Sequence, residues 1–219
     1  MTNKKYDVVA LGELLIDFTE NGLSEQGNPL LEANPGGAPC NVLSMLQKLG
    51  DKTAFIGKVG NDGFGHLLTK AVQEQGIDTT GLVYDNDVHT TLALVLKKEN
   101  GDRDFAFYRN PGADMNLKEK EVNESLIASS SIFHFGTLSL TDESVKKATQ
   151  KAVKVAKENG LTITFDPNLR EPLWRSLEEA HEQVAWGLQQ ADVVKISDNE
   201  ITWFTGMDNY DEGIAFLQK

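Results

Sequence analysis

The segment NPGGAPCN, residues 34–41, places two glycines, a proline and an asparagine directly before a helical pattern. Gly36 and Gly37 can adopt positive φ and let a ligand approach the backbone closely. Pro39 suits the first turn of a helix, where free N–H groups can bind hydroxyl oxygens or an anion. Asn41 offers a carbonyl and an amide together, which matches the paired hydroxyls of a sugar. The segment therefore predicts either a small-molecule site or a tight turn with a capping asparagine.

Further polar clusters follow the predicted strands, which is where open α/β sheets bind their ligands. Each cluster alone is weak evidence, because strand ends need turns and turns favour Asp, Asn, Pro and Gly. Their joint placement at one sheet edge favours a site. The clusters comprise Gly12, Glu13 and Asp17, then His134, then residues 108–114, 166–170 and 195–200.

Apolar patterns predict alternating strands and helices. The expected strands are 8–11, 53–59, 131–135, 161–165 and 193–196, and the expected helices are 42–49, 64–72, 145–156 and 177–188. Gly50, Gly76 and Gly160 stand where helix C-cap glycines belong. Alternation implies right-handed crossovers and a mostly parallel sheet covered by helices on both faces, which is an α/β fold.

One stretch breaks the alternation. Residues 91–96 and 104–109 are both strand-like, and Asn100-Gly101 between them is a strong hairpin signal. The segment 18–34 is too polar for a core helix. We expect both stretches, within about 18–34 and 88–112, to form a small β-sheet lid that pairs with a second subunit, because an exposed sheet edge needs a cover or a partner.

Composition excludes some classes of function. The 33 acidic and 21 basic residues give a net charge of -12, which disfavours nucleic acid and anionic membranes as partners. No apolar run is long enough to span a membrane, and we read no signal peptide. Cys40 is the only cysteine, so no intrachain disulfide can form. A reducing compartment, the cytoplasm, is therefore expected.

Two signatures identify a family. No G-x-G-x-x-G follows the first strand and no Walker phosphate loop occurs. Instead, GGAPCN (36–41) and GKVGNDGFG (57–65) resemble the ribokinase-like (PfkB) carbohydrate kinases across essentially all 219 residues. FYRNPGAD (107–114) and FDPNLR (165–170) narrow the resemblance to bacterial fructokinases, with 2-keto-3-deoxygluconate kinases as near neighbours. Leu43 departs from the small residue of the pattern, which concerns helix packing more than chemistry.

The resemblance implies a three-layer α/β/α sandwich with a small β-sheet lid. It also implies transfer of the γ-phosphoryl group of ATP to a sugar hydroxyl, with Mg²⁺. Binding of sugar hydroxyls is implied for Asp17, Gly36, Gly37 and Asn41, because a carboxylate can accept two hydroxyls and fix the orientation of the sugar. Arg109 and Asp114 are implied to reach the sugar from the lid.

The resemblance also implies a phosphate side. Asn168, Lys195 and Glu200 are expected toward the nucleotide, and Arg170 is expected to supply positive charge as the phosphoryl group moves. Glu200 matches the acidic end of the family's Asn-x-x-Glu element, which helps to organise magnesium. Ser197 stands at the Asn position of that element, and the variation weakens the correspondence.

The chain stops at Lys219, before the family's Gly-Ala-Gly-Asp motif, which provides the general base and an anion hole, and before its adenine pocket. We therefore interpret the chain as the N-terminal portion of a sugar kinase, most simply one converting fructose to fructose 6-phosphate in a homodimer. The alternatives are another sugar kinase, a nucleoside kinase, against which DFAFYRNPGAD argues mildly, or a sugar-binding or regulatory protein without catalysis.

Overall fold

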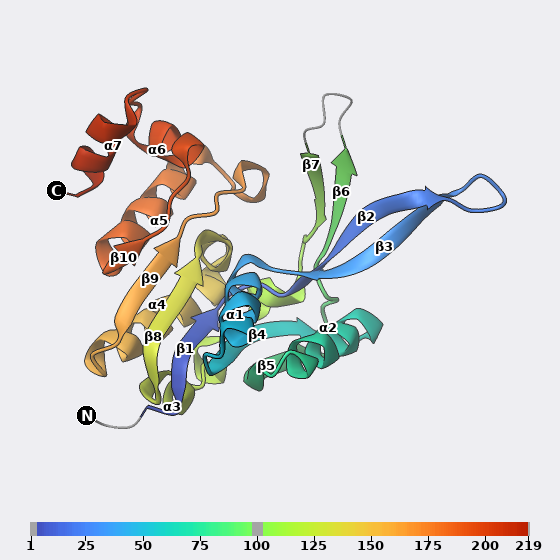
Figure 1. The fold of residues 1–219 in the computed structure, drawn as a ribbon, viewed down its shortest axis with the longest axis horizontal. Coiled ribbons are helices and arrows are strands. Elements are labelled where there is room, and N and C mark those ends of the chain that lie inside the picture. Colours follow the sequence, from blue (N-terminus) through green and yellow to red (C-terminus); the bar gives the residue numbers. More distant parts are fainter. Residues whose placement is uncertain (1–3, 98–102, 219) are drawn as a thin grey trace.

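The computed structural model describes residues 4–97 and 103–218 (Figure 1). A main sheet and a smaller second sheet share the chain. The strands are β1 Tyr6–Leu11, β2 Leu15–Leu23, β3 Pro29–Gly36, β4 Thr53–Gly60, β5 Asp78–Asp85, β6 Leu92–Lys97, β7 Arg103–Tyr108, β8 Ser130–Gly136, β9 Thr162–Asp166 and β10 Val193–Val194. The helices are α1 Ala38–Leu49, α2 Gly63–Glu74, α3 Glu124–Ala128, α4 Glu143–Glu158, α5 Leu177–Gln190, α6 Asp198–Thr205 and α7 Tyr210–Leu217.

The main sheet has six parallel strands in the order β10-β9-β8-β1-β4-β5. It confirms the predicted parallel α/β sheet. The sequence did not predict β5, because its DTTGLVYD pattern lacks a continuous apolar run. The predicted strand 193–196 is shorter than expected, since only Val193 and Val194 pair with β9.

Helices cover both faces of this sheet, because successive strand residues point to opposite sides. In β1, Val9 and Leu11 pack in one core with α4, while Val8 and Ala10 pack in a second core with α1 and α2. These two cores give the three-layer sandwich. Gly50 ends α1 with a left-handed φ of 101°, as the sequence predicts for a C-cap glycine.

The second sheet has the order β3-β2-β6-β7, with β2 and β6 parallel and the other pairs antiparallel. Residues 18–34, 92–97 and 103–108 therefore lie in the small separate sheet that the sequence predicts. Its first strand begins earlier than expected, at Leu15. The predicted Asn100-Gly101 turn lies outside the described residues, although the pairing of Lys97 with Arg103 is the register of a hairpin.

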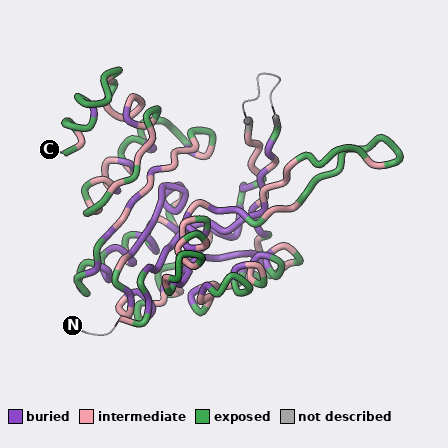
Figure 2. The backbone as a smooth tube through the Cα atoms, viewed as in Figure 1, coloured by how far each residue is buried: buried purple, intermediate pink, exposed green. Residues whose placement is uncertain are grey.

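The second sheet projects from the body of the molecule (Figure 1). Its base beside β1 and α1 is buried, while the outer half of β2 and β3 is exposed (Figure 2). The base therefore lies against the carboxyl end of β1. Across residues 4–97 and 103–218, none of the helices has the length and apolar character needed to cross a membrane.

Candidate functional site

A polar depression of about 100 Å³ lies where the small sheet meets the carboxyl edge of the main sheet. Five residues for which the sequence predicts a binding or catalytic role line it: Asp17 from β2, Gly37 and Asn41 at the start of α1, and Asn168 and Arg170 from the loop after β9. Segments more than 100 residues apart thus converge, as the common edge of parallel strands predicts.

The glycine turn before α1 is shaped by close approach. Gly37 has φ 123°, and a Cβ there would overlap the carbonyl oxygen of Glu13. Gly36 does not need positive φ, but a Cβ on it would overlap the Asp17 carboxylate. Pro39 occupies the first helical turn, as predicted. The turn is therefore built to let Asp17 and the backbone approach each other.

Asp17 is half-buried and faces a positive charge. Burial raises the pKa of its carboxyl above the usual value, and Arg170 acts in the opposite direction. The Arg170 guanidinium lies over the ring of Phe105 in β7, 5.5 Å from its centroid, and donates a hydrogen bond to the Leu169 carbonyl at 3.0 Å. Arg170 thereby connects the loop after β9 to the small sheet.

A second depression, of about 290 Å³, shares Asn168 and Arg170 with the first and adds Lys195 and Glu200. The Lys195 ammonium lies 3.2 Å from the Asp166 carboxylate and its side chain is largely exposed. The two depressions thus form a continuous polar surface that runs from Asp17 to Lys195.

The Glu200 carboxylate links two segments through hydrogen bonds. One carboxylate oxygen accepts the Leu169 N–H at 2.7 Å, and the other accepts the Ser197 N–H at 2.9 Å and its hydroxyl at 2.7 Å. Ser197 and Glu200 form the capping box that starts α6. Glu200 therefore fixes the loop that carries Asn168 and Arg170.

The charges here suit phosphate better than a directly bound metal ion. Arg170 and Lys195 are cations, and Asn168 adds an amide, which are the groups that bind phosphate oxygens. Within residues 4–97 and 103–218, no group of three His, Cys, Asp or Glu side chains could hold a metal ion. The indirect role of Glu200 toward Mg²⁺ stays a prediction.

Arg109 and Asp114 lie beside the depression but do not line it. Both are buried, at 6% and 4% exposure. Arg109 donates to Asp114 through Nε at 2.8 Å, to the Thr141 hydroxyl at 2.8 Å and to the Leu138 carbonyl at 2.9 Å. The structure thus shows a buried ion pair where the resemblance implies sugar contacts, and those contacts stay a prediction.

Glu13 also lines the depression; the sequence places it in the polar cluster after the first strand but predicts no binding or catalytic role for it. Burial raises the pKa of its carboxyl to about 7. The available signal was a carboxylate directly after Gly12, at the end of the central strand. His134 is also buried, and burial lowers its pKa to about 4. It does not line the depression.

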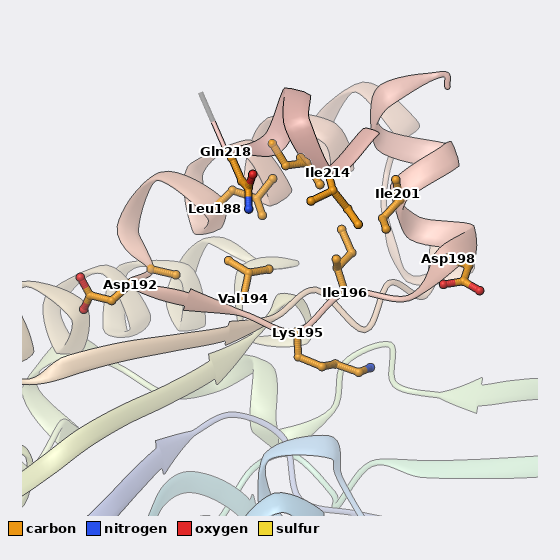
Figure 3. A pocket seen from close by; sticks show the side chains of 11 residues that line it. Leu188, Asp192, Val194, Lys195, Ile196, Asp198, Ile201, Ile214 and Gln218 are labelled. Carbon is orange, nitrogen blue, oxygen red and sulfur yellow. The ribbon is translucent and has the colours of Figure 1, made fainter. Parts of the chain in front are cut away.

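An apolar groove of about 860 Å³ lies along the edge strand β10 and shares Lys195 with the second depression (Figure 3). Val194 and Ile196 point into it, together with Ile201 of α6 and Ile214 of α7 (Figure 3). The Lys195 side chain points the opposite way (Figure 3). On its groove side β10 has no strand partner among the described residues.

Comparison with known proteins gives a consistent picture. A profile described as "pfkB family carbohydrate kinase" matches residues 5–219. "Probable fructokinase-2" of Arabidopsis thaliana is 45% identical over 211 residues, which cover 95% of this chain and 64% of that protein. The chain thus spans less than two thirds of the length of that relative.

Solved structures of fructokinases are also similar to this chain. Fructokinase from Xylella fastidiosa with bound ATP is 31% identical, with a TM-score of 0.87 over 97% of this chain and 65% of that one. A double mutant of fructokinase from Vibrio cholerae, in a form with fructose, ADP and potassium ion bound, is 30% identical. Its TM-score is 0.85 over 100% of this chain and 69% of that one.

Proposed function

The chain belongs to the pfkB family of carbohydrate kinases, and from this premise we propose that its protein transfers the γ-phosphoryl group of ATP to fructose. The product is fructose 6-phosphate. The observation that carries the proposal is the convergence of Asp17, Asn41 and Arg170 on one polar depression. Relatives named as fructokinases, and solved fructokinases holding fructose, ADP or ATP, support the choice of substrates.

The sugar half of the reaction is assigned to the depression beside the glycine turn. Asp17 accepts hydrogen bonds from sugar hydroxyls, and the amide of Asn41 both donates and accepts. Gly36 and Gly37 let the sugar approach the backbone without a side chain in the way. The small sheet, which carries Phe105 and Phe107 on the rim, excludes water as a lid.

The phosphate half is assigned to the continuous polar surface around Arg170. Phosphoryl transfer depends on positioning and on stabilising negative charge, rather than on covalent chemistry by the protein. Arg170, Lys195 and Asn168 would hold the phosphates of ATP and offset the charge that spreads over the transferred group. The sugar oxygen bonds to phosphorus as the bond to ADP breaks, and the hydroxyl proton passes to the base expected after Lys219.

Magnesium belongs to the proposal only in an indirect form. In this proposal Glu200, which fixes the loop after β9, would accept hydrogen bonds from water around a metal–nucleotide complex. No step is assigned to the metal ion, and none of the described His, Cys, Asp and Glu side chains form a group of three that could hold one.

We also include a homodimer and a cytoplasmic location in the proposal. Exposed apolar side chains on the small sheet, Leu23, Leu30, Leu31, Leu96 and Tyr108, support association of two copies through this sheet. Sedimentation of the full-length protein tests the dimer, and charged substitutions at Leu30 and Leu31 should give monomers.

The test of activity uses the full-length protein with ATP, Mg²⁺ and each candidate acceptor. ADP release and phosphorus NMR of the product should show the highest kcat/KM for fructose. A higher kcat/KM for 2-keto-3-deoxygluconate or for a nucleoside would change the proposed substrate but not the proposed phosphoryl transfer. Fructose binding without ADP release would instead establish a sugar-binding protein without catalysis.

A further inference from the structure

Glu13 is a buried carboxylate in the wall of the sugar depression to which no role has been assigned so far. It follows β1 and Gly12 and is 4% exposed. Its Oε1 accepts a hydrogen bond from the Ala38 N–H at 2.7 Å. Its own carbonyl oxygen occupies the space that a Cβ on Gly37 would need. The side chain of Glu13 therefore holds the turn at residues 37–38, and its backbone packs closely against Gly37.

That turn determines where the sugar-binding groups lie. Gly37, Ala38 and Asn41 all line the same depression as Glu13. The Asn41 N–H donates to the Gly37 carbonyl at 3.0 Å, so the turn and the first turn of α1 move together. A change in the hydrogen bond from Ala38 to Glu13 would shift these groups relative to Asp17.

The titratable groups that face Glu13 come from three elements. Cys40 lies on α1, Arg109 follows β7, and Asp114 lies in the short 3₁₀ turn Ala113–Asn116. Arg109 pairs directly with Asp114, not with Glu13. Two buried carboxylates therefore share the field of one guanidinium.

The same environment makes Glu13 titrate near neutral pH. Burial raises the pKa of Glu13 to about 7, Asp114 adds to the rise, and the Ala38 N–H and Arg109 oppose it. Two further ionisable groups, Asp17 and Arg170, also line the depression.

We propose that Glu13 is a positioning residue for the sugar: its ionised carboxylate fixes the Gly37–Ala38 turn through the Ala38 N–H, and its protonation loosens the turn and weakens sugar binding. This inference rests on the proposed function, because the ligand is the proposed sugar. A hydrogen bond to an ionised acceptor is roughly twice as strong as one to a neutral acceptor, which sets the direction of the effect.

The expected behaviour follows from that direction. In the full-length protein, KM for fructose should rise severalfold as the pH falls from about 8 to about 6, across the range where Glu13 takes up its proton. KM for ATP should not rise over the same pH range, because Glu13 does not line the depression that contains Lys195.

Three variants test the role. Glu13→Gln keeps the shape and an acceptor oxygen but cannot ionise, so KM for fructose should become flat across this pH range. It should also lie above the wild-type value at high pH. Glu13→Ala leaves the Ala38 N–H without an acceptor and should raise KM by about tenfold or more. Glu74→Gln on α2, whose side chain is 66% exposed, is the matched control and should behave like wild type.

Some outcomes would overturn the inference. One is a Glu13→Gln enzyme whose KM follows pH as the wild type does. Another is a lower melting temperature with an unchanged KM in both Glu13 variants, which would indicate a purely structural role. If Glu13→Ala does not fold, the pH dependence of KM for fructose in Glu13→Gln alone tests the inference. Calorimetric titration with fructose separates the two proposals: wild-type protein that neither binds nor phosphorylates any sugar contradicts the proposed function itself.

Discussion

Arg109 and Asp114 form a buried ion pair in which Nη2 of the arginine lies 2.7 Å from Oδ2 of the aspartate. Their side chains are only 2% and 3% exposed. The pair joins the end of β7 to the segment that follows it, and the remaining guanidinium contacts reach Thr141 and Leu138. The base of the small sheet is thereby fixed to the main body at the edge of the sugar depression.

Asp114→Ala should destabilise the protein more than it weakens sugar binding. Removing one partner of a buried ion pair leaves an uncompensated charge, which costs about 3–5 kcal/mol. Urea unfolding of the full-length protein measures this change. Glu74→Ala, which breaks an exposed pair with Lys70, is the control and should change stability by less than about 0.5 kcal/mol. Unchanged stability with a raised KM for fructose would favour direct sugar contact by Asp114.

Asp17→Ala should weaken use of fructose far more than use of ATP. A charge-assisted pair of hydrogen bonds to sugar hydroxyls is lost, which is worth on the order of 2–3 kcal/mol or more. Steady-state kinetics with each substrate varied in turn give the two effects separately. An unchanged KM and kcat for fructose would remove Asp17 from the site.

Gly36→Ala should weaken the use of fructose, in the same direction as Asp17→Ala but to a smaller extent. The added methyl group would occupy the space of the Asp17 carboxylate and displace it from the depression. We expect a clear rise in KM for fructose with a smaller change in stability. Gly63→Ala at the start of α2 is the matched control, because a Cβ there meets nothing within 4 Å. Equal kinetics for both variants would contradict the close approach of residues 17 and 36.

Much of this site could be predicted from the sequence, because short stretches of neighbouring residues encode it. The end of a strand, a glycine turn and a helix start are each encoded by neighbouring residues, so the positions of Asp17, Gly37 and Asn41 were predictable. The loop carrying Asn168 and Arg170 was predictable because parallel strands place their carboxyl ends at one edge.

Other features of the structure depend on distant contacts, which a local sequence pattern does not encode. Arg109 and Asp114 are polar residues in a turn-like segment, and nothing local distinguishes a buried pair from a ligand-binding pair. Glu13 acquires its role only when Ala38 folds against it. β5 is stabilised by pairing with β4 and not by its own pattern, which is why its polar sequence did not indicate a strand.

His134 should make the protein sensitive to acid. Burial lowers its pKa from 6.5 to about 4. Between these values the unfolded state binds the proton and the folded state does not, so stability is present above pH 6.5 and is lost as the pH falls toward 4. The loss is on the order of 3 kcal/mol at most. Urea midpoints from pH 7 to pH 4 should fall less steeply for His134→Gln than for wild type, and equal slopes would contradict the assignment.

The 219-residue chain alone should show no measurable kinase activity. The polar surface from Asp17 to Lys195 holds groups for a sugar and for phosphates, but the general base and anion hole implied by the resemblance follow Lys219. Arg170 and Glu200 cannot replace the base, since Glu200 is engaged with Leu169 and Ser197 and an arginine does not take up a proton.

The groove along β10 also bears on how the 219-residue chain should behave when it is isolated. Its apolar lining, and the side of β10 that has no strand partner in the described part of the chain, favour either packing of further chain or aggregation. The purified 219-residue chain, incubated with ATP, Mg²⁺ and fructose, should release no ADP, while the full-length protein does so under the same conditions. It should also bind a hydrophobic dye more strongly than the full-length protein, and Ile196→Lys should reduce that binding. Turnover comparable to that of the full-length enzyme would show that the base lies within residues 1–219.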